Sequence, residues 1–176
     1  MTTTRKKPGA GLAPIRDSSG RAARKTKVLF VCIGNSCRSQ IAEALVRHMA
    51  ADVIEPSSAG TAALGSIASS TVQVLAERGI RVDGQYSKQL RAEDGQAADL
   101  IINMTGQPGT LLFPEEAAKV EDWKVPDPYW ADLELQRQVR ENIAARIAQV
   151  AERLRQQQGK EADCGAKKPA SRGKTT

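Results

Sequence analysis

The chain has 176 residues, 40% of them hydrophobic, which is enough for one domain with a buried core. Its formal net charge of +6 comes from the two ends, because residues 1–27 hold eight basic residues against one acid and residues 159–176 hold five against two. The pattern excludes a transmembrane helix, because no run of about 18 apolar residues occurs, and the N-terminus lacks the apolar core of a secretory signal.

The composition divides the chain into three parts. Residues 1–26 and 159–176 are rich in Gly, Pro, Ala, Ser, Thr and basic residues without apolar periodicity, so we expect disordered basic tails. Residues 27–158 are expected to form the single folded domain. The tails hold no aromatic residues that could stack on bases. We therefore expect neither a specific nucleic-acid partner nor a membrane partner.

The middle part alternates between strand and helix patterns. Short apolar runs predict four strands, at 28–32, 52–55, 99–104 and 120–123. Apolar residues at three/four spacing predict helices over 38–50, 67–78 and 131–157, with a short helix at 108–113. This alternation predicts an α/β fold: a single three-layer domain with a short four-stranded parallel sheet flanked by helices.

The segment CIGNSCRS, from Cys32 to Ser39, lies between the first strand and the first helix. Backbone amides of such a loop, a helix N-terminus and the guanidinium of Arg38 together predict a cradle for a tetrahedral oxyanion such as phosphate. Gly34 and Asn35 are residue types that tolerate the positive φ angles that such a loop needs. The predicted cradle therefore follows directly after the first strand.

Cys32 stands at the base of this loop and is the candidate nucleophile. A helix N-terminus and a nearby cation favour the reactive thiolate, and Ser39 can donate its hydroxyl hydrogen to it. The remaining candidate binding residues of the loop are Ile33, Gly34, Asn35, Ser36 and Cys37.

Two other readings of the loop are disfavoured by the sequence. Cys32 and Cys37 lack a second ligand pair for a metal, since His48 is the only histidine and lies inside the predicted helix. The glycine-rich nucleotide-binding motifs are absent. We expect neither a metal nor a cofactor. The three cysteines, with Cys164 as an incidental thiol in the tail, fit a reducing cytoplasm.

The segment VLFVCIGNSCRS resembles the N-terminal motif of the low-molecular-weight protein tyrosine phosphatases and of the related thiol-dependent arsenate reductases. The segment VPDPYW, residues 125–130, resembles the aspartate loop of that family. The resemblance runs from about Lys27 to about Gln157. It implies that Asp127 is the general acid and base, and that Tyr129 and Trp130 form aromatic walls of the substrate pocket.

These features predict a cytoplasmic phosphomonoester hydrolase that uses a cysteinyl-phosphate intermediate. The expected substrate is a phosphotyrosine protein or a small aryl phosphate. Cys32 attacks phosphorus, Arg38 and the loop amides hold the oxyanion, and Asp127 protonates the leaving group and then activates water.

Two positions depart from the phosphatase pattern and keep alternatives open. Gln40 stands where many phosphatases carry proline, and Gln85 stands where many have a histidine that supports the loop. The first alternative is an arsenate reductase that uses an external thiol, because the stretch 104–109 lacks the additional cysteines of thioredoxin-coupled reductases. The second alternative is a non-catalytic phosphate-binding regulatory module.

Overall fold

The structure is a computed structural model, and it describes residues 24–166. It contains, in chain order, β1 (Thr26–Cys32), α1 (Arg38–Met49), β2 (Ile54–Gly60), α2 (Ser69–Ala76), α3 (Ala92–Ala97), β3 (Leu100–Asn103), α4 (Gly109–Leu112), the 3-10 helix η1 (Ala117–Lys119), β4 (Val120–Asp122) and α5 (Leu133–Ala166). No helix within residues 24–166 has both the length and the apolar character required to cross a bilayer.

The four strands form one parallel sheet in the order β2-β1-β3-β4. The register pairs Cys32 with Gly60 and Val31 with Asn103, so the carboxyl ends of the three neighbouring strands meet at one edge of the sheet. The predicted α/β class and the parallel four-stranded sheet are confirmed. Cys32 lies at this edge, and parallel sheets bind their ligands beyond the carboxyl ends of their strands.

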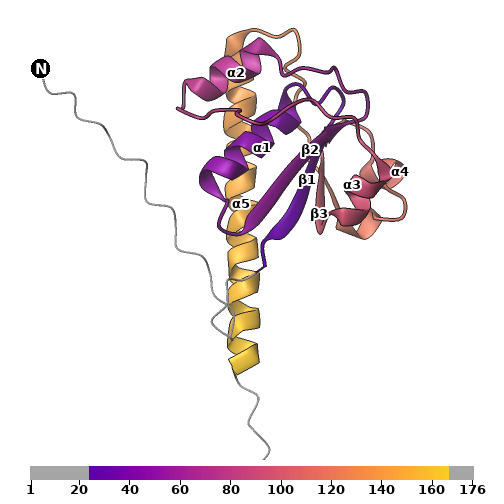
Figure 1. The fold of residues 1–176 in the computed structure, drawn as a ribbon, viewed down its shortest axis with the longest axis vertical. Coiled ribbons are helices and arrows are strands. Elements are labelled where there is room, and N and C mark those ends of the chain that lie inside the picture. The colour runs from indigo at the N-terminus through magenta and orange to yellow at the C-terminus, as the bar shows by residue number, and fades with distance from the viewer. Residues whose placement is uncertain (1–23, 167–176) are drawn as a thin grey trace, which may run out of the picture.

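Helices cover both faces of the sheet (Figure 1). The last five residues of β1 are all apolar and buried. Val28 and Phe30 face the core that includes residues of α1 and α5, whereas Leu29 and Val31 face a smaller core that contains Phe113 near α4. Side chains alternate across a strand, so a continuous apolar run requires cover on both sides. This is the physical origin of the three layers.

The packing of α1 against α5 holds α1 in place beside the candidate site. Ile41 and Leu45 of α1 and Ile143 and Ile147 of α5 are buried in the larger core. Each such side chain stabilises the fold by about 1.5–3 kcal/mol relative to an exposed one. The first turn of α1 is thereby held rigidly at the carboxyl edge of the sheet.

The second strand lies later in the chain than predicted. The apolar pattern predicts a strand at 52–55, whereas β2 spans Ile54–Gly60 and includes Pro56. Proline has no N–H to donate, but β2 is an edge strand with only β1 as a neighbour, so the missing donor is tolerated. Because β2 extends to Gly60, it leads directly into the loop that contacts the cradle.

The ends of the folded part also differ from the prediction. The helix expected to end near residue 157 continues as α5 to Ala166, so disorder from residue 159 onward is contradicted as far as Ala166. At the other end, Thr26 begins β1 and Arg24 forms a 2.9 Å ion pair with Asp99. The predicted disorder of residues 1–23 and 167–176 falls outside the described residues.

Candidate active site

The loop from Cys32 to Ser36 is held from outside by the segment that follows β2. Backbone N–H groups within residues 61–68 donate to the carbonyl oxygens of Cys32, Ile33, Gly34 and Ser36 at 2.9–3.1 Å. The C=O and N–H of a trans peptide unit point in opposite directions. The N–H groups of the same peptide units therefore point away from this segment, as an oxyanion cradle requires.

Asn35 lies behind the loop and organises it. Its φ angle of 44° places it in the left-handed region, and its side chain is fully buried. Its Oδ1 accepts the backbone N–H of Lys88 at 2.6 Å, while its Nδ2 donates to Ser39 Oγ at 2.8 Å and to Ser58 Oγ at 2.9 Å. A backbone N–H can only donate, so Lys88 fixes which end of the amide faces the hydroxyls.

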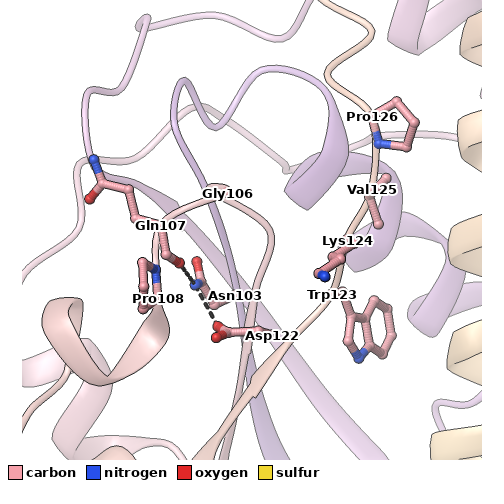
Figure 2. A pocket seen from close by; sticks show the side chains of 9 residues that line it. All are labelled: Asn103, Gly106, Gln107, Pro108, Asp122, Trp123, Lys124, Val125 and Pro126. Carbon is pink, nitrogen blue, oxygen red and sulfur yellow. Dashed lines mark hydrogen bonds between the residues drawn. The ribbon is translucent and has the colours of Figure 1, made fainter.

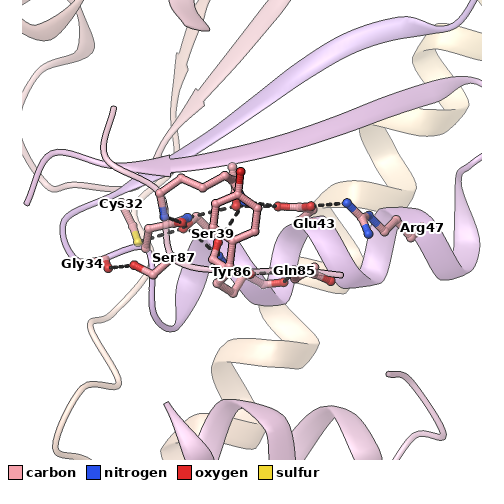
Figure 3. Close-up of polar contacts among 12 residues, drawn as sticks. Cys32, Gly34, Ser39, Glu43, Arg47, Gln85, Tyr86 and Ser87 are labelled. Carbon is pink, nitrogen blue, oxygen red and sulfur yellow. Dashed lines mark hydrogen bonds and ion pairs between the residues drawn. The ribbon is translucent and has the colours of Figure 1, made fainter. Parts of the chain in front are cut away.

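This orientation leaves the hydroxyl hydrogen of Ser39 available for the hydrogen bond at Cys32. Ser39 Oγ lies 3.0 Å from Cys32 Sγ, and it already accepts a hydrogen bond from Asn35. Its own hydrogen is therefore free to point at the sulfur, which stabilises a thiolate. Figure 3 shows Ser39 between Cys32 and the side chain of Glu43.

The guanidinium of Arg38 is buried at the opposite side of the same cavity. Its Nη1 donates to the carbonyl oxygen of Met104 at 2.7 Å, and its Nη2 forms an ion pair with Oδ2 of Asp127. Its Nε is buried without a hydrogen-bond acceptor among the described residues. Nε and Nη2 lie on one edge of the guanidinium, and such an edge binds two oxygens of an oxyanion.

A cavity of about 230 Å³ brings the predicted chemical groups together. Its lining consists of Cys32, Ile33, Gly34, Ser36, Cys37, Arg38, Ala62, Leu64, Asp127 and Tyr129. The candidate nucleophile, the candidate cation and the candidate acid thus share one pocket, as predicted. Ala62 and Leu64 are new to the set, because no motif in the sequence marks them.

Three predicted binding residues do not line this cavity. Asn35 and Ser39 are fully buried behind the loop and support it through hydrogen bonds. Trp130 is 91% exposed and lines a neighbouring groove instead of the cavity. Its φ is 68°, and its ring packs edge-on against that of Tyr129 with centroids 4.7 Å apart, but of the two aromatic residues only Tyr129 lines the cavity.

Cys37 lies in the wall of the cavity at the N-terminal end of α1. Cys32 and Cys37 are both free thiols, and burial raises the pKa of the Cys37 thiol. Cys37 is therefore held as the neutral thiol. Among the described residues, no cluster of three or more His, Cys, Asp or Glu side chains is arranged as a metal site.

A larger cavity of about 550 Å³ lies behind the aspartate loop (Figure 2). Its polar groups bond to one another: Asn103 Nδ2 donates at 2.7 Å to both Asp122 Oδ1 and the backbone carbonyl of Gln107. It contains neither a thiol nor a guanidinium. Although it is larger, the chemistry assigns the candidate active site to the smaller cavity around Cys32.

Comparison with known proteins agrees with this geometry. A curated relative, the glutaredoxin arsenate reductase of a Synechocystis species, is 33% identical over 123 residues, which are 69% of this chain and 92% of the relative. The structure of an arginine phosphatase from Geobacillus stearothermophilus matches with a TM-score of 0.71 and 32% identity, over 77% of this chain and 96% of that chain.

A low molecular weight protein tyrosine phosphatase from T. tengcongensis matches with a TM-score of 0.66 and 32% identity, over 74% of this chain and all of that one. The family profile of low molecular weight phosphotyrosine protein phosphatases matches residues 27–160, which is most of the chain and all of its sheet except Thr26. The protein therefore belongs to the low molecular weight phosphotyrosine protein phosphatase family.

Proposed function

We propose that this protein hydrolyses aryl phosphomonoesters, with phosphotyrosine in a polypeptide as the substrate class, through a cysteinyl-phosphate intermediate. The observation that supports this best is the common cavity of Cys32, Arg38 and Asp127. A nucleophile, an oxyanion-binding cation and an acid within one small pocket are the three groups that phosphomonoester cleavage needs.

In the first step, the phosphoryl group enters the cradle and takes the place of the Asp127 carboxylate on the guanidinium of Arg38. Two of its oxygens bind the Nε and Nη2 edge, and the loop amides hold the remaining charge. The thiolate of Cys32 attacks phosphorus in line with the leaving oxygen. The S–P bond forms as the P–O bond breaks.

Asp127 supplies the proton that the leaving oxygen needs. Its carboxyl group lines the same cavity as Cys32, on the side of Arg38 where the phosphoryl group binds. In the second step, the resulting carboxylate takes a proton from a water molecule, whose oxygen attacks phosphorus and breaks the S–P bond. Phosphate leaves and the Cys32 thiolate is regenerated.

The mouth of the pocket supports an aromatic leaving group. Ile33, Leu64 and Tyr129 are partly exposed and apolar, and all three line the cavity. A phenyl ring stacks favourably against such side chains, whereas the short polar stem of phosphoserine does not reach them. The apolar mouth therefore favours phosphotyrosine over aliphatic phosphates.

A polypeptide substrate is supported by the groove beside the pocket. This groove, of about 530 Å³, shares Ser36, Leu64 and Tyr129 with the catalytic cavity and continues past the N-terminal end of α2 to the exposed ring of Trp130. Its other lining residues include Ser66, Ser69 and Ser70, whose hydroxyls suit backbone amides of a bound chain. A segment that flanks phosphotyrosine can follow this groove.

The test compares peptides that carry phosphotyrosine, phosphoarginine or phosphoserine with a small aryl phosphate. We expect the highest kcat/KM for the phosphotyrosine peptide, and a lower value for that peptide alone in Trp130→Ala. Cys32→Ser should lose turnover and keep phosphate binding, because Arg38 and the amides remain. Substantial hydrolysis by Cys32→Ser, or equal rates for phosphoserine and phosphotyrosine, would contradict the proposal.

A second candidate function is arsenate reduction with an external thiol, which the likeness to the Synechocystis reductase favours. Arsenate has the tetrahedral shape of phosphate and suits the same cradle. Reduction needs a second thiol, and Cys37 is a poor one because burial raises its pKa. Brisk arsenate reduction with glutathione or glutaredoxin, beside feeble aryl phosphate hydrolysis, would favour this function instead.

A further inference from the structure

We propose that Gln136 is a positioning residue that anchors the aspartate loop, residues 125–130. It lies in the first turn of α5 and does not line the catalytic cavity. Its role is to keep Asp127 at the cavity while an oxyanion occupies the guanidinium of Arg38. The proposal rests on the proposed function, because it concerns the acid of that reaction.

The side chain of Gln136 joins the aspartate loop to α2, and it is 1% exposed. Its Nε2 donates to the carbonyl oxygen of Pro128 at 2.6 Å and to Ser70 Oγ at 3.1 Å. A carbonyl oxygen can only accept a hydrogen bond, so Pro128 fixes which end of the amide faces the loop. Pro128 directly follows Asp127, and this hydrogen bond therefore holds the backbone beside the candidate acid.

The aspartate loop has few other attachments to the fold. Among the described residues, two side chains outside the loop form hydrogen bonds to it, those of Arg38 and Gln136. Arg38 binds the carboxylate of Asp127, and its contact with the carbonyl oxygen of Val125 is 3.5 Å long. In the proposed mechanism, the phosphoryl group takes the edge of Arg38 that binds Asp127. The bond from Gln136 then remains as the short connection between the loop and the rest of the fold.

The amide oxygen of Gln136 is buried without a hydrogen-bond donor among the described residues. A buried acceptor without a donor destabilises the folded state, and methionine would fill the same space without one. Without the amide, Pro128 keeps the N–H of Ala131 at 3.0 Å from its carbonyl oxygen, and Ser70 is only partly buried. We therefore expect Gln136→Met to fold at least as stably as the parent, with an aspartate loop that is less firmly held.

The first experiment measures hydrogen–deuterium exchange of the aspartate loop in Gln136→Met, with and without saturating inorganic phosphate. The N–H groups of Tyr129 and Ala131 bond to acceptors at positions 127 and 128, so their exchange reports the order of the loop. We expect exchange about two- to tenfold faster than in the parent, as the loss of one hydrogen bond allows. The difference should be larger with phosphate, because phosphate then occupies Arg38. Exchange in β1 and β3 and the melting temperature should not report a weaker fold.

The second experiment measures turnover in the same variant. A small displacement of Asp127 impairs proton transfer, so kcat should fall about tenfold for weakly acidic aryl phosphates and less for activated ones. The inhibition constant for inorganic phosphate should not rise, because Arg38 and the loop amides of the cradle are unchanged.

Three further variants complete the comparison. Ser70→Ala removes the other acceptor of the same Nε2 and should stay within about twofold of the parent in both experiments. Gln138→Met makes the same substitution at an exposed position of α5 and is the matched control. Gln136→Leu removes the same donor and is read if Gln136→Met fails to fold.

Three results would overturn the proposal in folded variants: unchanged exchange of the loop, a difference in exchange that phosphate does not enlarge, or an equal loss of kcat for every leaving group. Exchange requires no turnover. A failure of the parent and of every variant to hydrolyse phosphate esters would therefore count against the proposed function alone, while the exchange data still test the anchor.

Discussion

The carboxylate of Asp127 forms an ion pair with the guanidinium of Arg38, across the mouth of the cavity that holds Cys32. The Arg38 side chain is 5% exposed and the Asp127 side chain is 45% exposed, so the cation is fixed and the acid can move. Arg38 is also anchored by the carbonyl of Met104. Asp127 thus occupies the edge of Arg38 that an incoming oxyanion needs.

Replacement of Asp127 by asparagine tests its role as the acid that protonates the leaving group. The amide of the Asp127→Asn variant cannot protonate a leaving group, so kcat should fall by about 10²–10⁴ for alkyl and weakly acidic aryl phosphates, and least for activated aryl phosphates. The dependence of kcat on the pKa of the leaving group should therefore steepen. An unchanged dependence in a folded variant would remove Asp127 from the role of acid.

The same variant should bind oxyanions more tightly. A neutral amide competes less well than a carboxylate for the guanidinium of Arg38, so inorganic phosphate should inhibit Asp127→Asn at lower concentration. Isothermal titration of phosphate into the Cys32→Ser background gives the same comparison without turnover. Weaker phosphate binding in the Asp127→Asn protein would contradict competition between the two anions.

Peroxide should inactivate the protein reversibly through Cys32 and Cys37, which line the same cavity. Oxidation converts the Cys32 thiolate to a sulfenic acid. Cys37 then condenses with it, slowly because burial raises the pKa of its thiol but aided by its place in the same cavity, forming the disulfide and releasing water. In Cys37→Ser, the sulfenic acid should proceed to sulfinic acid, which reductant does not restore. Mass spectrometry and recovery with dithiothreitol test this; equal recovery of both proteins would contradict it.

Gly60 should tolerate no side chain, because a Cβ there would lie 2.5 Å from the carbonyl oxygen of Ile33 and 2.7 Å from the backbone N of Asn35. Gly60→Ala must therefore displace the cradle, and we expect weaker phosphate binding and a lower melting temperature. Gly159→Ala is the matched control, because nothing lies within 4 Å of a Cβ in that part of α5. Alanine there should stabilise the helix by about 0.5–1 kcal/mol. Normal phosphate binding by Gly60→Ala would show that the loop adapts.

Acid should weaken the attachment of α5 to the rest of the fold. Arg155 binds Asp52 through two 2.8 Å hydrogen bonds, and this guanidinium lowers the pKa of Asp52 in the folded state. A lowered folded pKa means that the stabilisation is fully present above the unfolded pKa of about 3.9 and is lost as pH falls through the folded value. Asp52→Asn should therefore reduce the free energy of unfolding by about 1–2 kcal/mol at pH 7.

Urea denaturation at several pH values measures this difference, which should shrink as the pH falls below about 4. Asp83→Asn is the control, because its ion pair with Arg81 is exposed on both sides and should contribute almost nothing. A difference between Asp52→Asn and its parent that is constant from pH 7 to pH 3 would contradict the ion-pair explanation.

The amino-acid sequence by itself determined the sheet class and the chemical groups of the site. The apolar run of β1 followed by a Cys–five–Arg loop and an amphipathic helix is a local pattern, because strand, loop and helix N-terminus are adjacent in the chain. Asp127 could be predicted from its motif and from the rule that loops after parallel strands meet at one edge. The parallel sheet, which the structure confirms, could be predicted from the local alternation of strand and helix patterns.

Only the tertiary structure decided how distant side chains meet. The contact of Gln85 with Gln40 joins positions that no spacing rule connects, and Leu64 reaches the pocket because its N–H bonds to the carbonyl of Gly34. Trp130 lies outside the pocket with its ring packed edge-on against Tyr129, a placement that its motif did not indicate. Such features depend on hydrogen bonds and dihedral angles that the complete fold selects, whereas periodicity records only which face of an element is apolar.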